Sequence, residues 1–271
     1  MNSSSRVIIT GSSGFIGSAL KKYFKDHKVS CLGISRKASE GTDIVVRNYH
    51  EAIGYNDGNT LLVNLAGNNT LISNNEINFI SALSESYKEK MIFMSSSRVY
   101  GYDSKGSMSE NKKLSNLNDY SKSKISLEKK ILKNKGMILR LSNVYGKGMS
   151  EHNIFNVLHD QIIENKKEII LKNMKSIRDF IYIDDFCECL LRVVSSKVRN
   201  LILNIGTGKG TDVLTLVKYM CKSLGHNYTD KNIISNELTE SRLVLDIGLS
   251  KKIYNWAPKT NIEKGIQKWL K

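Results

Sequence analysis

The stretch that decides the fold is Thr10-Gly11-Ser12-Ser13-Gly14-Phe15-Ile16-Gly17. It follows a short apolar run at residues 7–9, typical of a buried strand, and opens a segment with apolar residues at helical spacing. Gly11 would permit a tight turn, Gly14 would let the backbone approach a pyrophosphate, and Gly17 would let the helix pack closely on the strand. The N–H groups and positive dipole of the helix N-terminus would then meet the phosphates. The stretch predicts a dinucleotide-binding turn rather than a glycine turn without a ligand.

The rest of the first half alternates strands with helices. Apolar runs predict further strands, and apolar residues at helical spacing predict helices; the strands are expected at 29–34, 44–46, 61–65, 91–94 and 137–141, and the helices at 14–27, 77–87 and 120–132. This alternation predicts βαβ units and right-handed crossovers, with helices on both faces of a parallel sheet. We therefore expect an α/β protein with a Rossmann-type, doubly wound parallel sheet.

The second half is less regular and predicts a smaller, mixed α/β substrate lobe. Its helices are expected at 153–165, 184–195, 212–224 and 262–270, and its strands at 169–171, 180–183 and 201–205. Asp184 is expected to cap the second of these helices. We expect residues 1–145 to bind the dinucleotide and residues 146–271 to form the interleaved lobe, with a segment at about 180–205 returning to the sheet.

Composition excludes several classes of protein. The chain has 271 residues, of which 40% are hydrophobic, so it can bury a core. No apolar run is long enough to cross a bilayer, and the start of the chain has no signal-peptide core. Four cysteines in a chain of this length make no disulfide framework and favour the reducing cytoplasm. No metal site is expected.

The net charge of the chain is unusually high. Lys and Arg total 41 against 26 Asp and Glu, a formal net charge of +15, which suggests nucleic acid or another anion as partner. The lysines are scattered, however, and no block of like charges or basic segment with interleaved aromatics occurs. We interpret the excess mainly as compositional bias and expect neither nucleic acid nor membrane as partner. The alternative is that part of the excess positive charge forms a surface that binds anions.

The end of the second strand bears on the choice of cofactor. An acidic residue there would accept hydrogen bonds from the adenosine ribose, but Ser35 and Arg36 stand roughly 20 residues beyond the glycines. A guanidinium attracts a 2'-phosphate that a carboxylate would repel. We therefore expect NADP(H) rather than NAD(H); the alternative is that Arg36 is a solvated loop residue.

Two further motifs carry catalytic chemistry. Tyr120 and Lys124 form Tyr-x-x-x-Lys, which places both side chains on one face of a helix. An ammonium beside a phenol would lower its pKa, making Tyr120 a general acid or base for a carbonyl/alcohol pair. A serine-rich segment, residues 95–101, stands where the fifth strand ends, which is where open α/β sheets bind ligands. A serine hydroxyl there could polarise the same carbonyl.

With these motifs in order, the chain resembles the extended short-chain dehydrogenase/reductase superfamily. It is most similar to the branch of NAD(P)-dependent epimerases, dehydratases and reductases that act on nucleotide sugars. The resemblance covers nearly the whole chain and includes these further segments: Val63-Asn64-Leu65-Ala66-Gly67, Leu139-Arg140-Leu141-Ser142-Asn143-Val144-Tyr145-Gly146-Lys147-Gly148, Arg178-Asp179-Phe180-Ile181-Tyr182-Ile183-Asp184-Asp185, Asn204-Ile205-Gly206-Thr207-Gly208 and Trp256-Ala257-Pro258. Lys147 replaces the proline usual in the family.

The resemblance implies roles for individual residues. It implies Ser96, Tyr120 and Lys124 as the catalytic residues. The implied cofactor-binding residues are Gly11, Ser13, Gly14, Phe15, Ile16, Gly17, Ser35, Arg36, Leu65, Ala66, Gly67, Tyr120 and Lys124. The implied substrate-binding residues are Ser97, Asn143, Arg178 and Arg242, the last on a loose alignment. It also implies a homodimer through the helices at 77–87 and 120–132, and a place in polysaccharide biosynthesis.

Departures from the family pattern narrow the activity. The family's 4,6-dehydratases carry an acidic pair where this chain has Ser97 and Arg98, so dehydration is not expected. Its 3,5-epimerase-reductases use a cysteine at the position of Arg98. The third strand, which usually ends in an Asp near the adenine, is followed here by Arg47 and Asn48, which leaves that contact open.

The function expected is the NADPH-dependent reduction of a keto-sugar linked to a nucleoside diphosphate, with Tyr120 as the acid. The alternative is a nucleotide-sugar 4-epimerase that keeps NAD tightly bound. A more remote alternative, motivated by the basic charge, is a non-catalytic relative that binds nucleotide or RNA.

Overall fold

The computed structural model describes residues 6–67, 72–102, 106–115, 117–164, 168–227, 233–237 and 240–271. The strands are β1 (Val7–Thr10), β2 (Cys31–Ser35), β3 (Ile44–Val45), β4 (Leu61–Asn64), β5 (Met91–Ser96), β6 (Met137–Leu141), β7 (Asn143–Tyr145), β8 (Ile169–Asn173), β9 (Ser176–Tyr182), β10 (Ile202–Ile205), β11 (Gly210–Asp212), β12 (Ile233–Glu237) and β13 (Ser241–Leu243). The α-helices are α1 (Phe15–Asp26), α2 (Asn74–Tyr87), α3 (Asp119–Lys133), α4 (Ile154–Ile163), α5 (Ile183–Ser195), α6 (Val213–Leu224), α7 (Gly248–Tyr254) and α8 (Ile262–Leu270). Three 3-10 helices are η1 (Tyr49–Tyr55), η2 (Lys88–Lys90) and η3 (Ser97–Tyr100).

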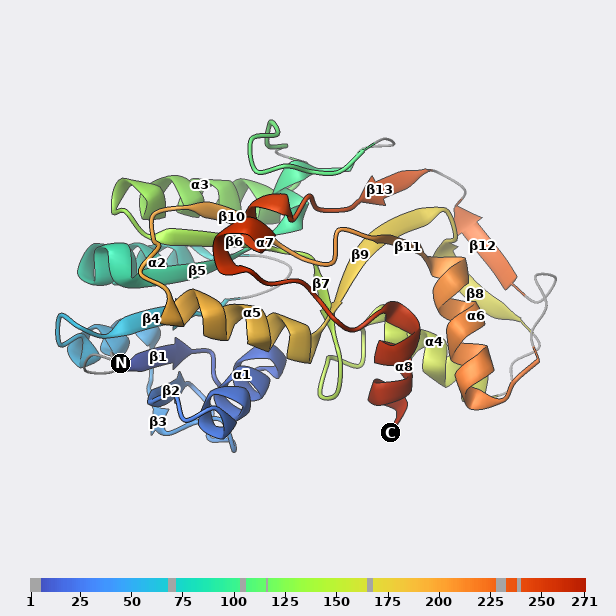
Figure 1. Cartoon of the computed structure of the whole chain (residues 1–271), viewed down its shortest axis with the longest axis horizontal. Helices are drawn as coiled ribbons and strands as arrows, with labels where there is room; N and C mark the ends of the chain where they lie inside the picture. Colours follow the sequence, from blue (N-terminus) through green and yellow to red (C-terminus); the bar gives the residue numbers. More distant parts are fainter. Residues whose placement is uncertain are drawn as a thin grey trace.

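Seven parallel strands form the main sheet, in the order β10-β6-β5-β4-β1-β2-β3. Neighbouring residues along a strand face opposite sides. Val7 and Ile9 pack with α1 and α5, whereas Ile8 packs with η1, α2 and α3. Because both faces are covered, the strands read as continuous apolar runs rather than as alternating ones. The expected doubly wound parallel sheet is confirmed (Figure 1).

The strand order reverses between β1 and its two neighbours, β2 and β4. In an open α/β sheet, the carboxyl ends of the strands at such a reversal form the crevice that binds ligands. The glycine stretch, which follows β1, begins at this crevice. The fold therefore places the predicted dinucleotide turn where this architecture binds its cofactors.

The second half of the chain builds two smaller sheets and also completes the large one. In one small sheet β9 pairs with β11, β13 and β7, and in the other β8 pairs with β12. α5 packs on α1, and β10 pairs with β6 at the edge of the main sheet. α8 lies beside α6, at the end of the molecule opposite the N-terminus (Figure 1).

Several predicted boundaries differ from the observed ones. The strand expected at 180–183 is β9, which begins at Ser176, and α4 ends at Ile163, while the predicted end at residue 165 lies outside the described residues. η1, β7, β11, β12, β13 and α7 were not predicted. Most of these elements are too short to show a hydrophobic period.

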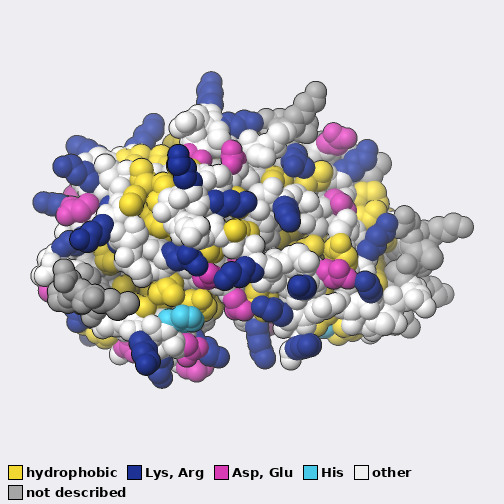
Figure 2. All heavy atoms as spheres, viewed as in Figure 1, with side chains coloured by type: hydrophobic (Ala, Val, Ile, Leu, Met, Phe, Trp, Pro, Cys, Tyr) yellow, Lys and Arg dark blue, Asp and Glu magenta, His cyan; other side chains and the backbone are white. Residues whose placement is uncertain are grey.

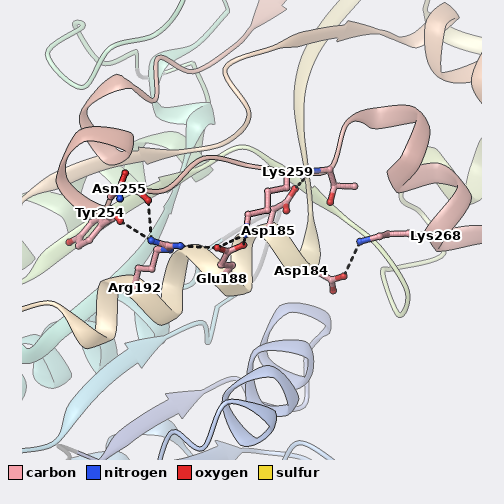
Figure 3. A network of polar contacts seen from close by, with 9 residues as sticks. Asp184, Asp185, Glu188, Arg192, Tyr254, Asn255, Lys259 and Lys268 are labelled. Carbon is pink, nitrogen blue, oxygen red and sulfur yellow. Dashed lines mark hydrogen bonds and ion pairs between the residues drawn. The ribbon is translucent and has the colours of Figure 1, made fainter. Parts of the chain in front are cut away.

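Asp184 does not cap α5, contrary to the prediction. Tyr182 occupies the N-cap position, and the Asp184 carboxylate lies in the first turn, 3.6 Å from Lys268 Nζ on α8. Figure 3 shows the contacts that join α5 to the C-terminal segment. Glu188 accepts from Arg192 (3.1 Å) and Lys259 (2.9 Å). These contacts hold the end of the chain against the helix that packs on α1.

Surface charge is spread rather than gathered. On the face drawn in Figure 2, Lys and Arg side chains are scattered over the surface, with acidic side chains among them. This distribution agrees with a compositional excess of lysine. All four cysteines are free. In the ranges given above, no helix is long and apolar enough to span a membrane, and no three potential metal ligands of the His, Cys, Asp and Glu types come together.

Candidate functional site

The glycine stretch forms a close backbone contact with the segment after β4. Gly11 has φ +77°, and a Cβ atom on it would lie 2.8 Å from the backbone nitrogen of Ala66. A Cβ on Gly17 would lie 2.2 Å from the Gly11 carbonyl oxygen. Only glycine fits at these two positions, so the turn brings the start of α1 against the residues that follow β4, namely Leu65, Ala66 and Gly67.

The N-terminus of α1 is open to an anion. Gly14 is its N-cap and offers no side chain to the first N–H groups, and the hydroxyl of Ser13 is turned to that of Ser35 on β2. The Ser12 hydroxyl is buried without a partner among the described residues. Phe15 and Ile16 begin the helix. An uncapped helix start with its positive dipole fits the pyrophosphate of a dinucleotide.

A cavity of about 940 Å³ lies between the residues that follow β2 and β3 and the start of α2. Arg36 and Arg47 both line it. The Arg36 guanidinium carbon lies 5.5 Å from the centroid of the Tyr49 ring. Tyr49, His50 and Gly67 also line the cavity. Two guanidiniums beside an aromatic ring suit an adenosine that carries an extra phosphate.

The three expected catalytic residues meet where β5 ends. Ser96 ends β5, while Tyr120 and Lys124 lie one turn apart on α3. The Ser96 hydroxyl is close enough to the Tyr120 phenol to lower its pKa. Lys124 Nζ donates to the carbonyl oxygen of Met94 (2.8 Å) and lies 5.9 Å from the centroid of the Tyr120 ring. The ammonium is therefore held by the strand, beside the phenol's ring.

Burial dominates the protonation of this set. It raises the pKa of Tyr120, against the lowering effects of the Ser96 hydrogen bond and the Arg98 charge. The expectation that Lys124 would bring the pKa of Tyr120 below 10 is therefore wrong for this state, because removal from water disfavours the phenolate. Burial likewise lowers the pKa of Lys124 to about 8, although the charge of Glu128 opposes this.

A buried ion pair ties α3 to β5 and β6 directly behind these residues. The Arg140 guanidinium on β6 donates to Glu128 on α3 at 2.7 Å, and each side chain is only 3% exposed. Glu128 also accepts from Ser95, the neighbour of Ser96, at 2.5 Å. Arg140 further donates to the Tyr100 hydroxyl (3.0 Å). One carboxylate thus fixes the helix that carries Tyr120 relative to the strand that carries Ser96.

Two predicted substrate residues lie on neighbouring strands of the small sheet. The Asn143 amide on β7 donates to the Asp179 carbonyl oxygen (3.1 Å). Arg178 on β9 donates to the carbonyl and hydroxyl of Ser241, at 2.7 and 2.8 Å, and lies 4.6 Å from the centroid of the Tyr102 ring. Because Tyr102 closely follows η3, Arg178 is brought to the loop that begins at Ser96.

Arg242 lies elsewhere. In the pairing of β13 with β9, Leu243 is opposite Arg178 and Arg242 is opposite Ile177, so the two arginines point to opposite faces of the sheet. Arg242 lines a second cavity, of about 520 Å³, with Lys175 and Lys218. The structure does not bring Arg242 together with Arg178. Ser97 is buried in the first turn of η3.

Sequence reasoning gave no role to Arg47, Tyr49 or His50, which line the larger cavity. The signal for Arg47 is its place after the third strand, which resembles the place of Arg36 after the second strand.

The doubly wound sheet and the glycine turn after β1 are typical of dinucleotide-binding enzymes. Residues 7–206 match the NAD dependent epimerase/dehydratase family. The chain belongs to this family, as its motifs predicted.

Relatives and a solved structure span the family's chemistries. The chain is 25% identical to GDP-6-deoxy-D-talose 4-dehydrogenase of Aggregatibacter actinomycetemcomitans, over 86% of this chain and 84% of that one. It is 26% identical to dTDP-4-dehydro-6-deoxyglucose reductase of Escherichia coli, over 98% and 96%. In fold it is similar to dTDP-glucose 4,6-dehydratase of Bacillus anthracis in complex with NAD (TM-score 0.84, 20% identity, 98% and 95% covered). The relatives are enzymes that act on nucleotide sugars.

Proposed function

We propose that the chain reduces a keto-sugar linked to a nucleoside diphosphate, with NADPH as the hydride donor. The observation that carries the proposal is the meeting of Ser96, Tyr120 and Lys124 at the end of β5. The use of NADPH is supported by the cavity at the ends of β2 and β3, which Arg36 and Arg47 line. Two of the relatives are a 4-dehydrogenase and a reductase of such sugars, which supports this class of reaction.

In this proposal each side chain has a separate task. NADPH, bound along the glycine turn, would supply the hydride. Tyr120 stays protonated at neutral pH because burial raises the pKa of its phenol, so it can donate a proton to the oxygen of the reduced carbonyl. Ser96 would hold the same oxygen by a hydrogen bond, and Lys124 would contact the nicotinamide ribose. Arg178 and Asn143 would bind the diphosphate and sugar.

The second candidate is a 4-epimerase, favoured by the shared catalytic set and by the family to which the chain belongs. An epimerase oxidises and re-reduces one carbon, so absorbance at 340 nm shows no net change. The purified protein should be mixed with NADPH and dTDP-4-dehydro-6-deoxyglucose, the substrate named by one relative. Stoichiometric NADPH loss supports the reductase; interconversion of UDP-glucose and UDP-galactose without loss supports the epimerase.

Arg36→Gln is expected to raise the KM for NADPH about tenfold, because one charge-assisted contact to an exposed phosphate is worth about 1.4 kcal/mol. The KM for NADH should stay the same. Steady-state kinetics with both cofactors measures this. Lys37→Gln is the matched control, since Lys37 neighbours Arg36 but is not among the residues lining the cavity. An equal loss with both cofactors would contradict a role in binding the 2'-phosphate.

Turnover is expected to fall as the pH rises through about 8, where the buried Lys124 loses its proton. The sign follows from the lowered pKa of Lys124: its positive charge is present below about 8 and lost above it, while Tyr120 still keeps its proton. The measurement is kcat against pH. Lys124→Arg should move this decline to higher pH, because a guanidinium keeps its charge. An unmoved decline in that variant would assign it to another group.

The homodimer and the cytoplasmic location stay predictions within this proposal. The outer side of α3 carries four exposed lysines, Lys122, Lys129, Lys130 and Lys133. A dimer formed through α2 and α3 would bring this charge close to its copy, so we expect it to be weaker at low salt.

A further inference from the structure

We propose that Arg98 is a positioning residue that stabilises the phenolate of Tyr120 after Tyr120 has given up its proton. The proposal rests on the proposed function, since Tyr120 is the proton donor there. Arg98 occupies the position at which the family's dehydratases carry an acidic residue and its 3,5-epimerase-reductases a cysteine. The proposed reduction assigns no role to Arg98.

The backbone of Arg98 is fixed between the catalytic loop and the catalytic helix. Its N–H donates to the Ser96 hydroxyl (3.2 Å), and its carbonyl accepts from the Ser121 hydroxyl (3.1 Å). Ser96 and Ser121 are respectively a member of the reactive set and the neighbour of Tyr120. The guanidinium carbon of Arg98 then lies 5.4 Å from the centroid of the Tyr120 ring. This is within the range of a cation–π contact.

The other cation beside Tyr120 is less available to it. Lys124 Nζ donates to the Met94 carbonyl, lies 4.6 Å from the Phe93 ring centroid, and feels the charges of Glu128 and Glu76. Arg98 by contrast lowers the pKa of Tyr120, as does the Ser96 hydrogen bond, while burial among apolar neighbours raises it. Among the described residues, the cations in contact with the Tyr120 ring are Arg98 from η3 and Lys124 from its own helix.

The step balances without a further reactant. The O–H bond of Tyr120 breaks, its proton passes to the alkoxide oxygen of the reduced sugar, and the electron pair remains on the phenolate. A guanidinium beside the ring attracts this phenolate more strongly than the neutral phenol, because Coulomb attraction is added to the cation–π contact. Arg98 would therefore lower the energy of the state that follows proton transfer.

The test is a titration of Tyr120 by NMR in protein labelled with 13C at tyrosine Cζ, without substrate. The Tyr120 signal is assigned from its absence in Tyr120→Phe. Arg98→Met covers the ring without a charge, and Arg98→Lys restores the charge. Arg98 is exposed, so both variants are expected to fold, and circular dichroism checks this.

The chemical shift of Tyr120 Cζ should reach its midpoint about one pH unit higher in Arg98→Met than in the wild type, which is an about tenfold lower ratio of phenolate to phenol at a given pH. Arg98→Lys should lie close to the wild type. Wild-type titration of Tyr120 in Arg98→Met would overturn the proposal. If Arg98→Met does not fold, Arg98→Gln makes the same comparison. Because no turnover is measured, the result is independent of whether the keto-sugar reductase assignment holds.

Discussion

Tyr120→Phe is expected to lower kcat for keto-sugar reduction by about 10³-fold, the usual worth of a placed general acid. The phenol is buried, so water cannot easily replace it as the proton donor. The KM for NADPH should change little, since the ring remains and only the hydroxyl is lost. Stopped-flow absorbance at 340 nm measures the rate of the reduction step.

Tyr219→Phe is the matched control, because Tyr219 lies on α6, in the other part of the molecule, and should leave kcat unchanged. A Tyr120→Phe enzyme with nearly full activity would show that the proton comes from elsewhere. A loss confined to KM would instead assign Tyr120 to binding.

The second large effect is expected on stability. Glu128→Ala should lower the free energy of unfolding by about 3–5 kcal/mol, since it leaves the Arg140 guanidinium buried and uncompensated. The Ser95 hydroxyl loses its acceptor as well. Urea denaturation followed by circular dichroism measures the change.

Two variants distinguish loss of the Glu128–Arg140 ion pair from a general destabilisation of α3. Lys122→Ala breaks the exposed pair with Asp119 on the same helix and should leave the urea midpoint nearly unchanged. Glu128→Ala combined with Arg140→Met removes the stranded charge and should recover part of the loss. A double variant no more stable than Glu128→Ala would mean that packing, rather than charge, causes the effect.

The sequence predicted the structure well in two kinds of place: segments long enough to show a hydrophobic period, and glycines where two backbone segments come close together. Apolar runs and helical spacing predicted β6 and α8 with their observed bounds. The glycines of the turn after β1 predicted a tight turn at Gly11 and close packing at Gly17, and the structure shows both. The meeting of Ser96 with Tyr120 followed from their places at the end of a strand and on the next helix, as the family resemblance implied.

Features that depend on tertiary contacts were not readable. Strands of three residues, such as β7 and β13, form because β9 offers them a partner, and no local pattern announces this. The opposite facing of Arg178 and Arg242 depends on that register. The hydrogen bond from Lys124 to the Met94 carbonyl and the burial of Tyr120 likewise arise only in the folded chain. For this reason the sequence predicted a lowered pKa for Tyr120, whereas burial raises it.

The pairing of β10 with β6 has a consequence for how the protein is made. Ile202 of β10 pairs with Ile138 of β6, so the two strands are some sixty residues apart in the sequence. During synthesis, β10 therefore leaves the ribosome well after β6. Until then β6 presents an unpaired apolar edge, and α1 lacks the helix α5 that covers it. The main sheet therefore cannot be completed until β10 and α5 have been synthesised. The nascent chain is most exposed to aggregation between the synthesis of β6 and that of β10.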